Sequence, residues 1–350
     1  MPSQSKPAKR AASKPTINDI ARLSGVSKKT VSRVINRADS INPQTRAKVE
    51  AMIAETGYVP NPQARALALG RNFLIGLIHD NPNAQMILNM QQGILEGLRD
   101  TEFEMLVRPV DRTSPALFED VERFISRQRL FGVVILPPLS ENDKLAKLVE
   151  SLGCRYVRMG SAELDDPQHI VASNDRDAVR EAVQYLIEQG HRRIGHITGP
   201  NGFRSAIERQ KGYEEALARA GIKVPQSMVV AGEYTFDSGV RATEKLLDMS
   251  PPPTAIFAAN DEMAAGVLFA ARLRGLQVPG QLSIIGFDDT PIASRVWPPL
   301  TTVRWPIVAM GRSAALKLIA SEAGRADAAE EPWRFVSTLI RRGSVTSPSA

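Results

Sequence analysis

Residues 16–36 read TINDIARLSGVSKKTVSRVIN, and this stretch predicts two short helices joined by a tight turn. Thr16, with Asp19 three residues later, is typical of a helix N-cap followed by an acidic first turn. Gly25 ends the first helix, because glycine tolerates the left-handed conformation that the turn requires. Ser27 then caps a second helix, which occupies the rest of the stretch.

The small and apolar residues of this stretch have the spacing of a helix-turn-helix. Ala21 is small enough to let two helices approach each other, and Gly25 makes the turn between them. Val31 and Val34 lie three residues apart on the inner face of the second helix. A third helix over residues 42–57, begun by an Asn-Pro pair and ended by a glycine, completes a three-helix domain.

The outer face of the second helix presents Lys28, Lys29, Ser32 and Arg33. The first residues of such a helix meet base edges in the major groove of DNA. Arginine and lysine suit the acceptors of guanine, while serine and threonine suit phosphates or several bases. The alternative is an ordinary three-helix bundle with a solvated charged face; we favour DNA contact because the whole spacing lies on a basic module.

Charge is divided unevenly along the 350-residue chain, whose net charge is +6. Residues 1–71 hold 13 Lys and Arg against 4 Asp and Glu, whereas the remainder hold 31 against 34. A small basic module on a slightly acidic body indicates a polyanionic partner for that module. Residues 1–14 lack the apolar core of a signal peptide, and we expect them to form a disordered basic tail.

Residues 61–71 predict a short helix, begun by Asn61 and Pro62 and ended by Gly70. A helix of this length is not stable alone in water. Its apolar residues, which include Ala64 and Leu67, share one face with no evident core to cover it. The segment is either a plain linker with Leu67 packed on the body, or a helix that orders on DNA with Leu67 wedged between base steps. The residues themselves leave these two readings balanced.

Several classes of protein are excluded by composition. A single cysteine, Cys154, rules out an intrachain disulfide and a Cys-rich zinc site. The four histidines show no HxxxH or HExxH spacing, and no apolar run approaches the roughly 18 residues that would span a bilayer. Because GxGxxG, GxxxxGK[ST] and GxSxG are all missing, we expect no enzyme, no cofactor and no bound metal. We expect the protein in the cytoplasm, associated with the nucleoid.

The chain resembles the lactose-repressor (LacI/GalR) family of transcription factors over about residues 15–345. The resemblance is carried by the opening stretch and by six further runs: TRAKVEAMIAETGYVPNPQARALA (45–68), IGLI (75–78), GHRRIGHITGP (190–200), AIFAANDEMAAG (255–266), SIIGFDDTPIA (283–293) and PPLTTVRWP (298–306). It implies a homodimer that binds a pseudo-palindromic DNA operator and responds to a small ligand.

The resemblance also implies roles for individual residues of the N-terminal module. Lys28 and Lys29 would be the main base-choosing positions, Asn61 would cap the hinge helix, and Leu67 would be the minor-groove wedge. Of the two alternatives for Leu67, a plain linker residue or a minor-groove wedge, the resemblance therefore favours the wedge. The full set of expected DNA contacts is Thr16, Ser27, Lys28, Lys29, Thr30, Ser32, Arg33, Asn36, Asn61, Ala64 and Leu67.

Beyond the linker, apolar runs alternate with amphipathic stretches, which predicts parallel sheets covered by helices on both faces. We expect strands over 73–78, 103–107, 132–136, 155–159, 169–172, 193–198, 228–231, 255–258 and 282–287. Helices are expected over 86–99, 115–127, 175–188, 207–220, 237–248 and 262–273. So large a region predicts two lobes, and the resemblance implies the type I periplasmic-binding-protein architecture.

The expected fold is therefore an all-α helix-turn-helix headpiece joined to an α/β body with two parallel-sheet lobes. Its expected parts are a tail (1–14), a helix-turn-helix domain (15–60), a hinge helix and linker (61–71), a bilobal ligand-binding and dimerisation domain (72–345) and a second tail (346–350). The last residues contain no leucine heptad, which favours a dimer over a tetramer.

Ligands of such folds bind beyond the carboxyl ends of strands, so the polar residues there are candidates for a pocket. Asp80, Asn81 and Asn83 follow the first strand, although an Asx-type turn would use the same residues. Asn260 and Asp261 follow a later strand, where one would cap the next helix and the other would face the ligand. Asp288 can accept two hydroxyl hydrogen bonds from a polyol, or cap a surface turn.

Aromatic residues near strand ends suit the apolar faces of sugar rings. The candidates are Phe203, Tyr234, Phe236 and Trp305. Trp305 departs from the glutamine common in the family, so it either reshapes the pocket or packs at the hinge between lobes; we favour the pocket. Arg209 is carried over from the family as a ligand-contacting arginine, with a surface ion pair as the alternative. Arg158 is a second departure, placed to pair with an anionic ligand group.

These features predict a repressor of carbohydrate-utilisation genes that a sugar or glycoside releases from its operator. The partners would be double-stranded DNA, a small-molecule effector and a second copy of the chain, with no membrane. One alternative is a corepressed regulator that responds to a purine or another metabolite. A sugar-binding or sugar-modifying protein without a regulatory role ranks lower, because a basic headpiece is present and no catalytic motif is found.

Overall fold

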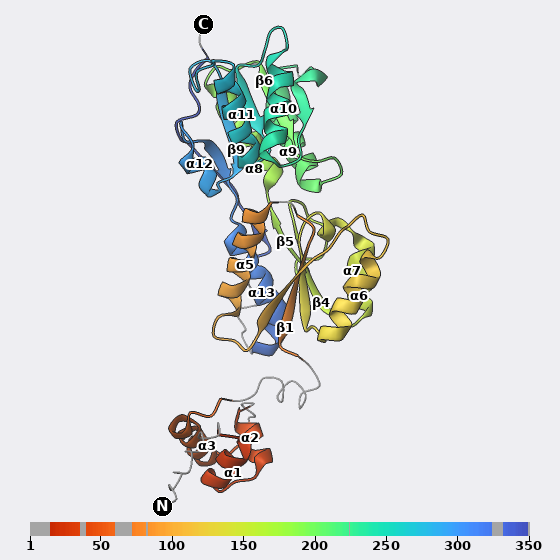
Figure 1. Ribbon diagram of the computed structural model, residues 1–350, viewed down its shortest axis with the longest axis vertical. Helices are drawn as coiled ribbons and strands as arrows, with labels where there is room; N and C mark the ends of the chain where they lie inside the picture. Colours follow the sequence, from red (N-terminus) through yellow and green to blue (C-terminus); the bar gives the residue numbers. More distant parts are fainter. Residues whose placement is uncertain are drawn as a thin grey trace, which may run out of the picture. The chain divides into compact units, whose positions relative to one another are not determined.

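The computed structural model describes residues 15–35, 40–59, 72–81, 83–223, 225–323 and 332–348 (Figure 1). The chain divides into two compact units, Met1–Asn72 and Phe73–Ala350, which we call the headpiece and the body. Several expected features lie outside the described residues: the N-terminal tail, the hinge segment 61–71, and the candidate contacts Asn36, Asn61, Ala64 and Leu67.

The headpiece contains three helices, α1 (Ile17–Ser24), α2 (Lys28–Ile35) and α3 (Pro43–Thr56). Asp19 accepts hydrogen bonds from the backbone and hydroxyl of Thr16, at 3.0 and 2.7 Å, and so fixes the start of α1. Gly25 has a φ of 64°, the left-handed conformation that the turn to α2 requires. The buried core of this unit consists of Ile20, Ala21, Val31, Val34 and Val49. The expected helix-turn-helix arrangement is present in the described residues.

The first lobe of the body, here the N-lobe, is built on a parallel sheet with the strand order β2-β1-β3-β4-β5-β11. Its strands are β1 (Leu74–His79), β2 (Glu104–Pro109), β3 (Gly132–Ile135), β4 (Arg155–Gly160), β5 (Ile170–Ser173) and β11 (Arg334–Phe335). Figure 1 shows α5 (Ala84–Leu98) and α13 (Ile307–Ala323) on one face, and α6 (Leu117–Gln128) and α7 (Asp143–Ser151) on the other. The short helix η1 (Leu139–Glu141) precedes α7.

The second lobe, the C-lobe, has the strand order β7-β6-β8-β9-β10-β12, with β12 antiparallel to β10. Its strands are β6 (Ile194–Thr198), β7 (Val229–Ala231), β8 (Ala255–Ala258), β9 (Ser283–Asp288), β10 (Thr301–Arg304) and β12 (Thr338–Ile340). Its helices are α8 (Asp175–Glu188), α9 (Arg204–Arg219), η2 (Gln226–Met228), α10 (Phe236–Leu247), α11 (Asp261–Leu273) and α12 (Pro291–Arg295).

The chain passes between the lobes three times: from β5 to α8, from β10 to α13, and from β11 to β12. The second passage returns a late segment to the N-lobe, where α13 packs closely against α5. A Cβ atom on Gly93 would lie 2.1 Å from the carbonyl oxygen of Val308, so glycine is needed for this approach. Gly97 meets the carbonyl oxygen of Arg312 in the same way, at 2.8 Å. Both lobes are thus interwoven along the sequence.

The expected two-lobed α/β fold is confirmed, and all nine expected strands are present with ends within two residues of the prediction. The sequence pattern missed three strands, β10 to β12, and the helices α7, α12 and α13. The body also continues beyond its expected end at residue 345: Thr346 exchanges hydrogen bonds with the hydroxyl of Ser283, at 3.0 and 3.1 Å. Among the described residues, no helix is long and apolar enough to cross a membrane.

Candidate functional site

The outer face of α2 carries exposed cations in the headpiece. Lys28, Lys29 and Arg33 are exposed, while Val31 and Val34 of the same helix are buried. The helical period therefore separates a charged face from an apolar one, as a helix that reads a DNA groove requires. Exposed cations of this kind attract phosphate groups, and salt screens that attraction.

Some of the other residues expected to contact DNA form hydrogen bonds at the starts of the headpiece helices. The hydroxyl of Ser27 accepts the backbone N–H of Thr30 at 3.1 Å and lies 2.9 Å from the hydroxyl of that residue. Ser27 thus caps α2 while staying exposed, and Thr30 and Ser32 are half-buried. Thr16 is exposed at the start of α1, where Asp19 accepts from its hydroxyl.

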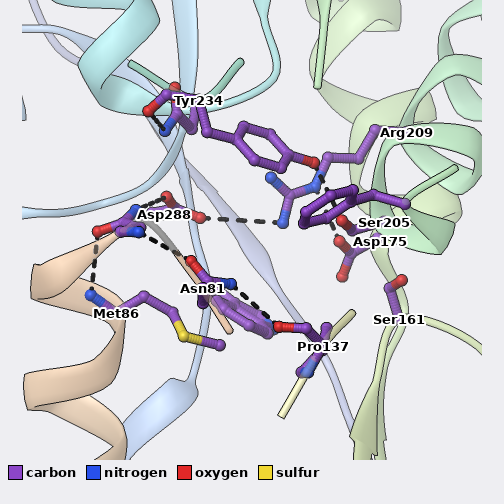
Figure 2. Close-up of a pocket in the computed structure, with 13 residues that line it drawn as sticks. Asn81, Met86, Pro137, Ser161, Asp175, Ser205, Arg209, Tyr234 and Asp288 are labelled. Atoms are coloured by element: carbon purple, nitrogen blue, oxygen red, sulfur yellow. Dashed lines mark hydrogen bonds and ion pairs between the residues drawn. The ribbon is translucent and has the colours of Figure 1, made fainter. Parts of the chain in front are cut away.

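The body holds a pocket between the carboxyl ends of the two parallel sheets (Figure 2). Parallel strands end at the same edge of a sheet, so residues that follow different strands meet there. The N-lobe contributes Asn81, Asn83, Met86, Pro137 and Ser161. The C-lobe contributes Asp175, Phe203, Ser205, Arg209, Tyr234, Asn260 and Asp288, and Trp305 lies where the chain leaves β10 for α13.

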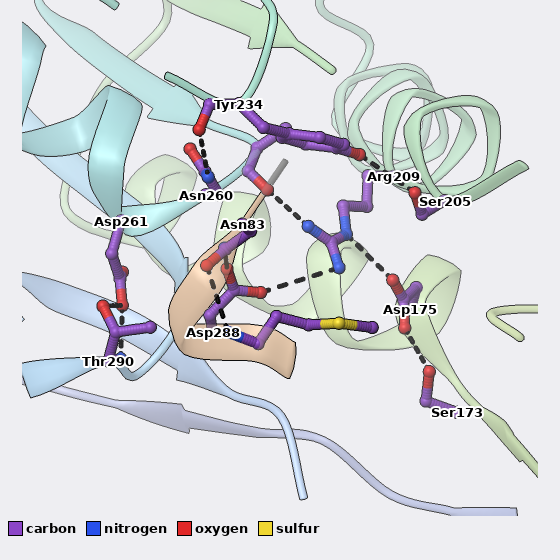
Figure 3. Close-up of polar contacts among 12 residues, drawn as sticks. Asn83, Ser173, Asp175, Ser205, Arg209, Tyr234, Asn260, Asp261, Asp288 and Thr290 are labelled. Carbon is purple, nitrogen blue, oxygen red and sulfur yellow. Dashed lines mark hydrogen bonds and ion pairs between the residues drawn. The ribbon is translucent and has the colours of Figure 1, made fainter. Parts of the chain in front are cut away.

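Arg209 is the central charge of this pocket, and it is only 4% exposed (Figure 3). Its Nε donates to Asp175 at 2.8 Å, and its Nη2 lies 3.8 Å from Asp288. Another guanidinium nitrogen donates to the carbonyl of Ala259, and the ring of Phe287 lies 3.6 Å from the guanidinium carbon. Arg209 is therefore held rigidly by the C-lobe, as a preorganised binding site requires.

The two carboxylates beside Arg209 differ in their surroundings. Asp175 is fully buried and also accepts the hydroxyl of Ser173. Burial raises the pKa of Asp288 well above its usual value, and the nearby Arg209 only partly opposes this effect. One cation thus faces two carboxyl groups, so the centre of the pocket has no surplus positive charge for an anionic ligand.

Tyr234 and Asn260 form a second polar group of the pocket. The amide nitrogen of Asn260 donates to the carbonyl of Tyr234 at 3.0 Å, and its amide oxygen accepts the N–H of Met263 at 2.9 Å. Asn260 therefore both caps α11 and lines the pocket, which joins the two roles considered for it. The Tyr234 hydroxyl lies 3.0 Å from that of Ser205. Its ring covers Gly199, where a Cβ would lie 2.2 Å from the ring.

Three contacts join the lobes around the pocket. The amide of Asn83 donates to Asp288 at 3.4 Å, and the backbone N–H of Arg204 donates to both oxygens of Glu141 at 3.0 Å. The guanidinium carbon of Arg112 lies 4.6 Å from the centre of the Phe203 ring. Burial raises the pKa of Glu141 to about 7, against the effects of the Arg204 N–H and nearby arginines. Opening the cleft would break these contacts.

Trp305 is almost buried at the passage between lobes and also lines the pocket. Trp305 thus lies both in the pocket and at the hinge between the lobes, which were considered as alternatives. Its indole Nε1 is buried and has no hydrogen-bond partner among the described residues. A buried donor without a partner costs about 1–3 kcal/mol, which a ligand acceptor could offset.

Three expected pocket residues lie elsewhere. Arg158 is 3% exposed and does not line the pocket, because its donors bind Asp143, Asp165 and two backbone carbonyls. Asp80 lines a neighbouring cavity and forms an ion pair with Arg112. Phe236 begins α10 and packs against the ring of Phe269, with 5.6 Å between ring centres. Only the long-range packing distinguishes these residues from the eight expected residues that do line the pocket.

The prediction also omitted five lining residues, namely Met86, Pro137, Ser161, Asp175 and Ser205. Ser161 follows β4 directly, and Asp175 comes two residues after β5. The strand-end argument used for Asp288 would therefore have found both. The methionine and the proline carry no comparable signal in the sequence. No group of three or more His, Cys, Asp or Glu side chains in the described part of the chain could hold a metal ion.

Two family models match this chain. Residues 16–61 match the model of bacterial regulatory proteins of the lacI family, and residues 183–345 match the periplasmic binding protein-like domain. Curated relatives match nearly the whole chain. The HTH-type transcriptional regulator CelR of Thermobifida fusca is 36% identical over 331 residues, which cover 92% of this chain and 95% of the relative. The ribose operon repressor of Escherichia coli K12 is 30% identical, with coverages of 94% and 99%.

Solved structures of regulators have the same fold. A CelR–cellobiose complex is 33% identical, has a TM-score of 0.69, and covers 94% of this chain and 99% of its own. A lac repressor dimer, bound to operator and the anti-inducer ONPF, is 29% identical with a TM-score of 0.76 and coverages of 95% and 99%. The relatives are transcriptional regulators and not enzymes.

Proposed function

Since the chain belongs to the LacI family of bacterial transcriptional regulators, we propose that it represses carbohydrate-utilisation genes and that a sugar or glycoside releases it from DNA. The observation that carries the proposal is the pairing of two features on one chain. One is the exposed cationic face of α2, and the other is a buried pocket that combines amides, hydroxyls and carboxyl groups with aromatic rings. Such a regulator acts in the cytoplasm, where the chromosome lies.

On the DNA side, we propose that Lys28 and Lys29 choose bases in the major groove while Arg33 and the hydroxyls beside it bind phosphates. The exposure of the three cations supports this assignment. By the family resemblance, Asn61 would cap a hinge helix and Leu67 would wedge into the minor groove. Two headpieces in a dimer would then read two half-sites of a pseudo-palindrome.

Exposed apolar stripes support a second copy of this chain as the partner. Leu88 and Leu95 lie seven residues apart on α5 and are 58% and 50% exposed. On α11, Phe269 and Leu273 lie four residues apart and are 46% and 69% exposed. Each pair shares one face of its helix. Burial of both faces against a second copy would remove this apolar surface from water.

The proposed ligand is neutral and rich in hydroxyl groups. Asn83, Asn260 and Asp288 supply hydrogen-bonding groups, while Phe203, Tyr234 and Trp305 supply apolar faces for the C–H side of a sugar ring. Two relatives support this class, since one is a complex with cellobiose and another is a ribose operon repressor. The paired charges of the pocket speak against a purine corepressor bearing phosphate.

Allosteric release would follow from the contacts between lobes. A ligand that shifts Asn83 against Asp288, or Glu141 against Arg204, changes the angle between the lobes. That change would alter the spacing of the two hinge helices of a dimer. Operator and ligand must then weaken each other's binding by the same factor.

The proposal is tested by selecting duplexes from a random library with the purified protein and screening sugars by thermal shift. The selected site should be pseudo-palindromic, and log affinity should fall linearly with log salt concentration. A sugar that raises the melting temperature should lower operator affinity. Selection of no preferred duplex would reject the DNA-binding part, and a sugar that binds without changing operator affinity would reject the allosteric part.

A further inference from the structure

A second cavity of about 410 Å³ borders the pocket described above. The linings of the two cavities share Asn81 and Phe203. The N-lobe side of the outer cavity is the end of β1 and the segment 109–113, and the C-lobe side is Pro200 and Phe203. Its volume lies within the range of about 300–1,000 Å³ that is usual for small-molecule sites. The two cavities therefore adjoin at Asn81 and Phe203, so a ligand of the inner pocket would have its next space in the outer cavity.

Arg112 forms a fixed polar wall of this outer cavity. Its guanidinium lies 3.7 Å from a carboxylate oxygen of Asp80, which also accepts the Arg112 backbone N–H at 3.2 Å. The guanidinium carbon lies 4.6 Å from the centre of the Phe203 ring. Arg112 is thus held from two sides, and a planar guanidinium of this kind offers several donors to ring hydroxyls.

His79 adds an unsatisfied polar atom to the same lining. Its Nδ1 is buried and has no hydrogen-bond partner in the part of the chain that the structure describes. Burial lowers the pKa of His79, although the negative charge of Asp80 acts in the opposite direction. The lowered pKa favours the neutral form of the imidazole ring. A neutral imidazole nitrogen can accept from, or donate to, a hydroxyl group.

The geometry points to a second sugar subsite in the outer cavity, so that the effector is a disaccharide or a longer glycoside. This inference rests on the proposed function, because it extends the ligand of the inner pocket. The charge of the outer cavity favours a neutral ring, since Asp80 and Asp111 supply two carboxylates against the single guanidinium of Arg112. Pro109 and Pro200 provide apolar surface beside these groups. The apolar C–H face of a sugar ring could pack against this surface.

The inference is tested with the full-length protein and paired saccharides: glucose and cellobiose, galactose and lactose, mannose and mannobiose, xylose and xylobiose. Calorimetry gives the ratio of disaccharide to monosaccharide affinity for each pair. We expect at least one pair with a ratio of about tenfold or more. Thr113→Trp fills the outer cavity from its exposed rim, and it should lower that ratio below about threefold.

Glu244→Trp, on the exposed face of α10, adds the same bulk away from both cavities and should leave the ratio unchanged. Arg112→Ala, which removes donors instead of adding bulk, should also lower the ratio and serves if the tryptophan variant fails to fold. The inference is overturned if every disaccharide that binds does so no more tightly than its monosaccharide, or if both variants keep the ratio. Absence of binding by every saccharide would instead reject the sugar-responsive function itself, and the inference with it.

Discussion

The arginines and lysines assigned to function lie in opposite environments in the headpiece and in the body. In the headpiece, Lys28, Lys29 and Arg33 stand in solvent above a core of five buried apolar residues. In the body, Arg209 and Arg158 are almost fully buried, and each is bound by two carboxylates. An exposed cation attracts a polyanion and is screened by salt, whereas a buried cation holds neighbouring groups in one geometry. The same side-chain chemistry can therefore serve DNA attraction in one unit and ligand positioning in the other.

The largest expected effect is that of Arg209→Ala on the body. The change would leave Asp175 and Asp288 without their cation, and these carboxylates are 0% and 11% exposed. Removing one partner of a buried ion pair costs about 3–5 kcal/mol of unfolding free energy. Denaturant unfolding should show this loss, and the thermal shift caused by the effector should disappear.

Arg158→Ala is the matched comparison, because it removes an equally buried arginine that does not line the pocket. Its partner Asp143 is 74% exposed and can be solvated by water after the change. We expect a smaller loss of unfolding free energy and an intact effector response. Equal loss of effector binding in both variants would contradict the assignment of Arg209 to the pocket.

In the headpiece, Lys29→Ala should weaken binding to the selected operator about ten- to a hundredfold, as the loss of a base contact does. Unfolding of the body and binding of the effector should not change, since Lys29 is exposed and belongs to the other unit. Fluorescence anisotropy on selected and scrambled duplexes measures both affinity and discrimination. Lys144→Ala removes the same charge from the exposed surface of α7, and a comparable loss with that variant would show a general charge effect.

The smallest expected effect concerns the contact between Glu141 and Arg204 across the lobes. Burial raises the pKa of Glu141 from 4.5 to about 7, so the folded state holds a proton that the unfolded state releases. This contribution to stability is complete below pH 4.5 and is lost as the pH rises through about 7.

Glu141→Gln should therefore gain stability relative to the unchanged protein as the pH rises from 5 to 8. Melting temperatures of both proteins across this range give the difference. Glu244→Gln, on an exposed helix face, should show a constant difference at every pH. A constant difference for Glu141→Gln as well would mean that Glu141 has an ordinary pKa.

Much of the local structure followed from the sequence. The cap at Thr16, the left-handed Gly25 and the inward-facing valines of α2 depend on residues only a few positions apart, and all are observed. The nine expected strands are likewise present, and most are short runs rich in apolar residues. The strand-end argument also led to Asn83, Asn260 and Asp288, since the edge of a parallel sheet is set by where its strands end.

By itself, then, the sequence determined the helix-turn-helix, the two-lobed α/β body and the edge at which a ligand can bind. The tertiary structure alone decided which side chains line the pocket at that edge. The sequence offered both Arg158 and Arg209 as pocket residues, but Asp143 and Asp165 bind Arg158 away from the pocket, while Asp175 and Asp288 hold Arg209 within it. The reason is physical: local hydrogen bonds and apolar periods act over a few residues, whereas a buried charge depends on partners that only the folded chain brings together.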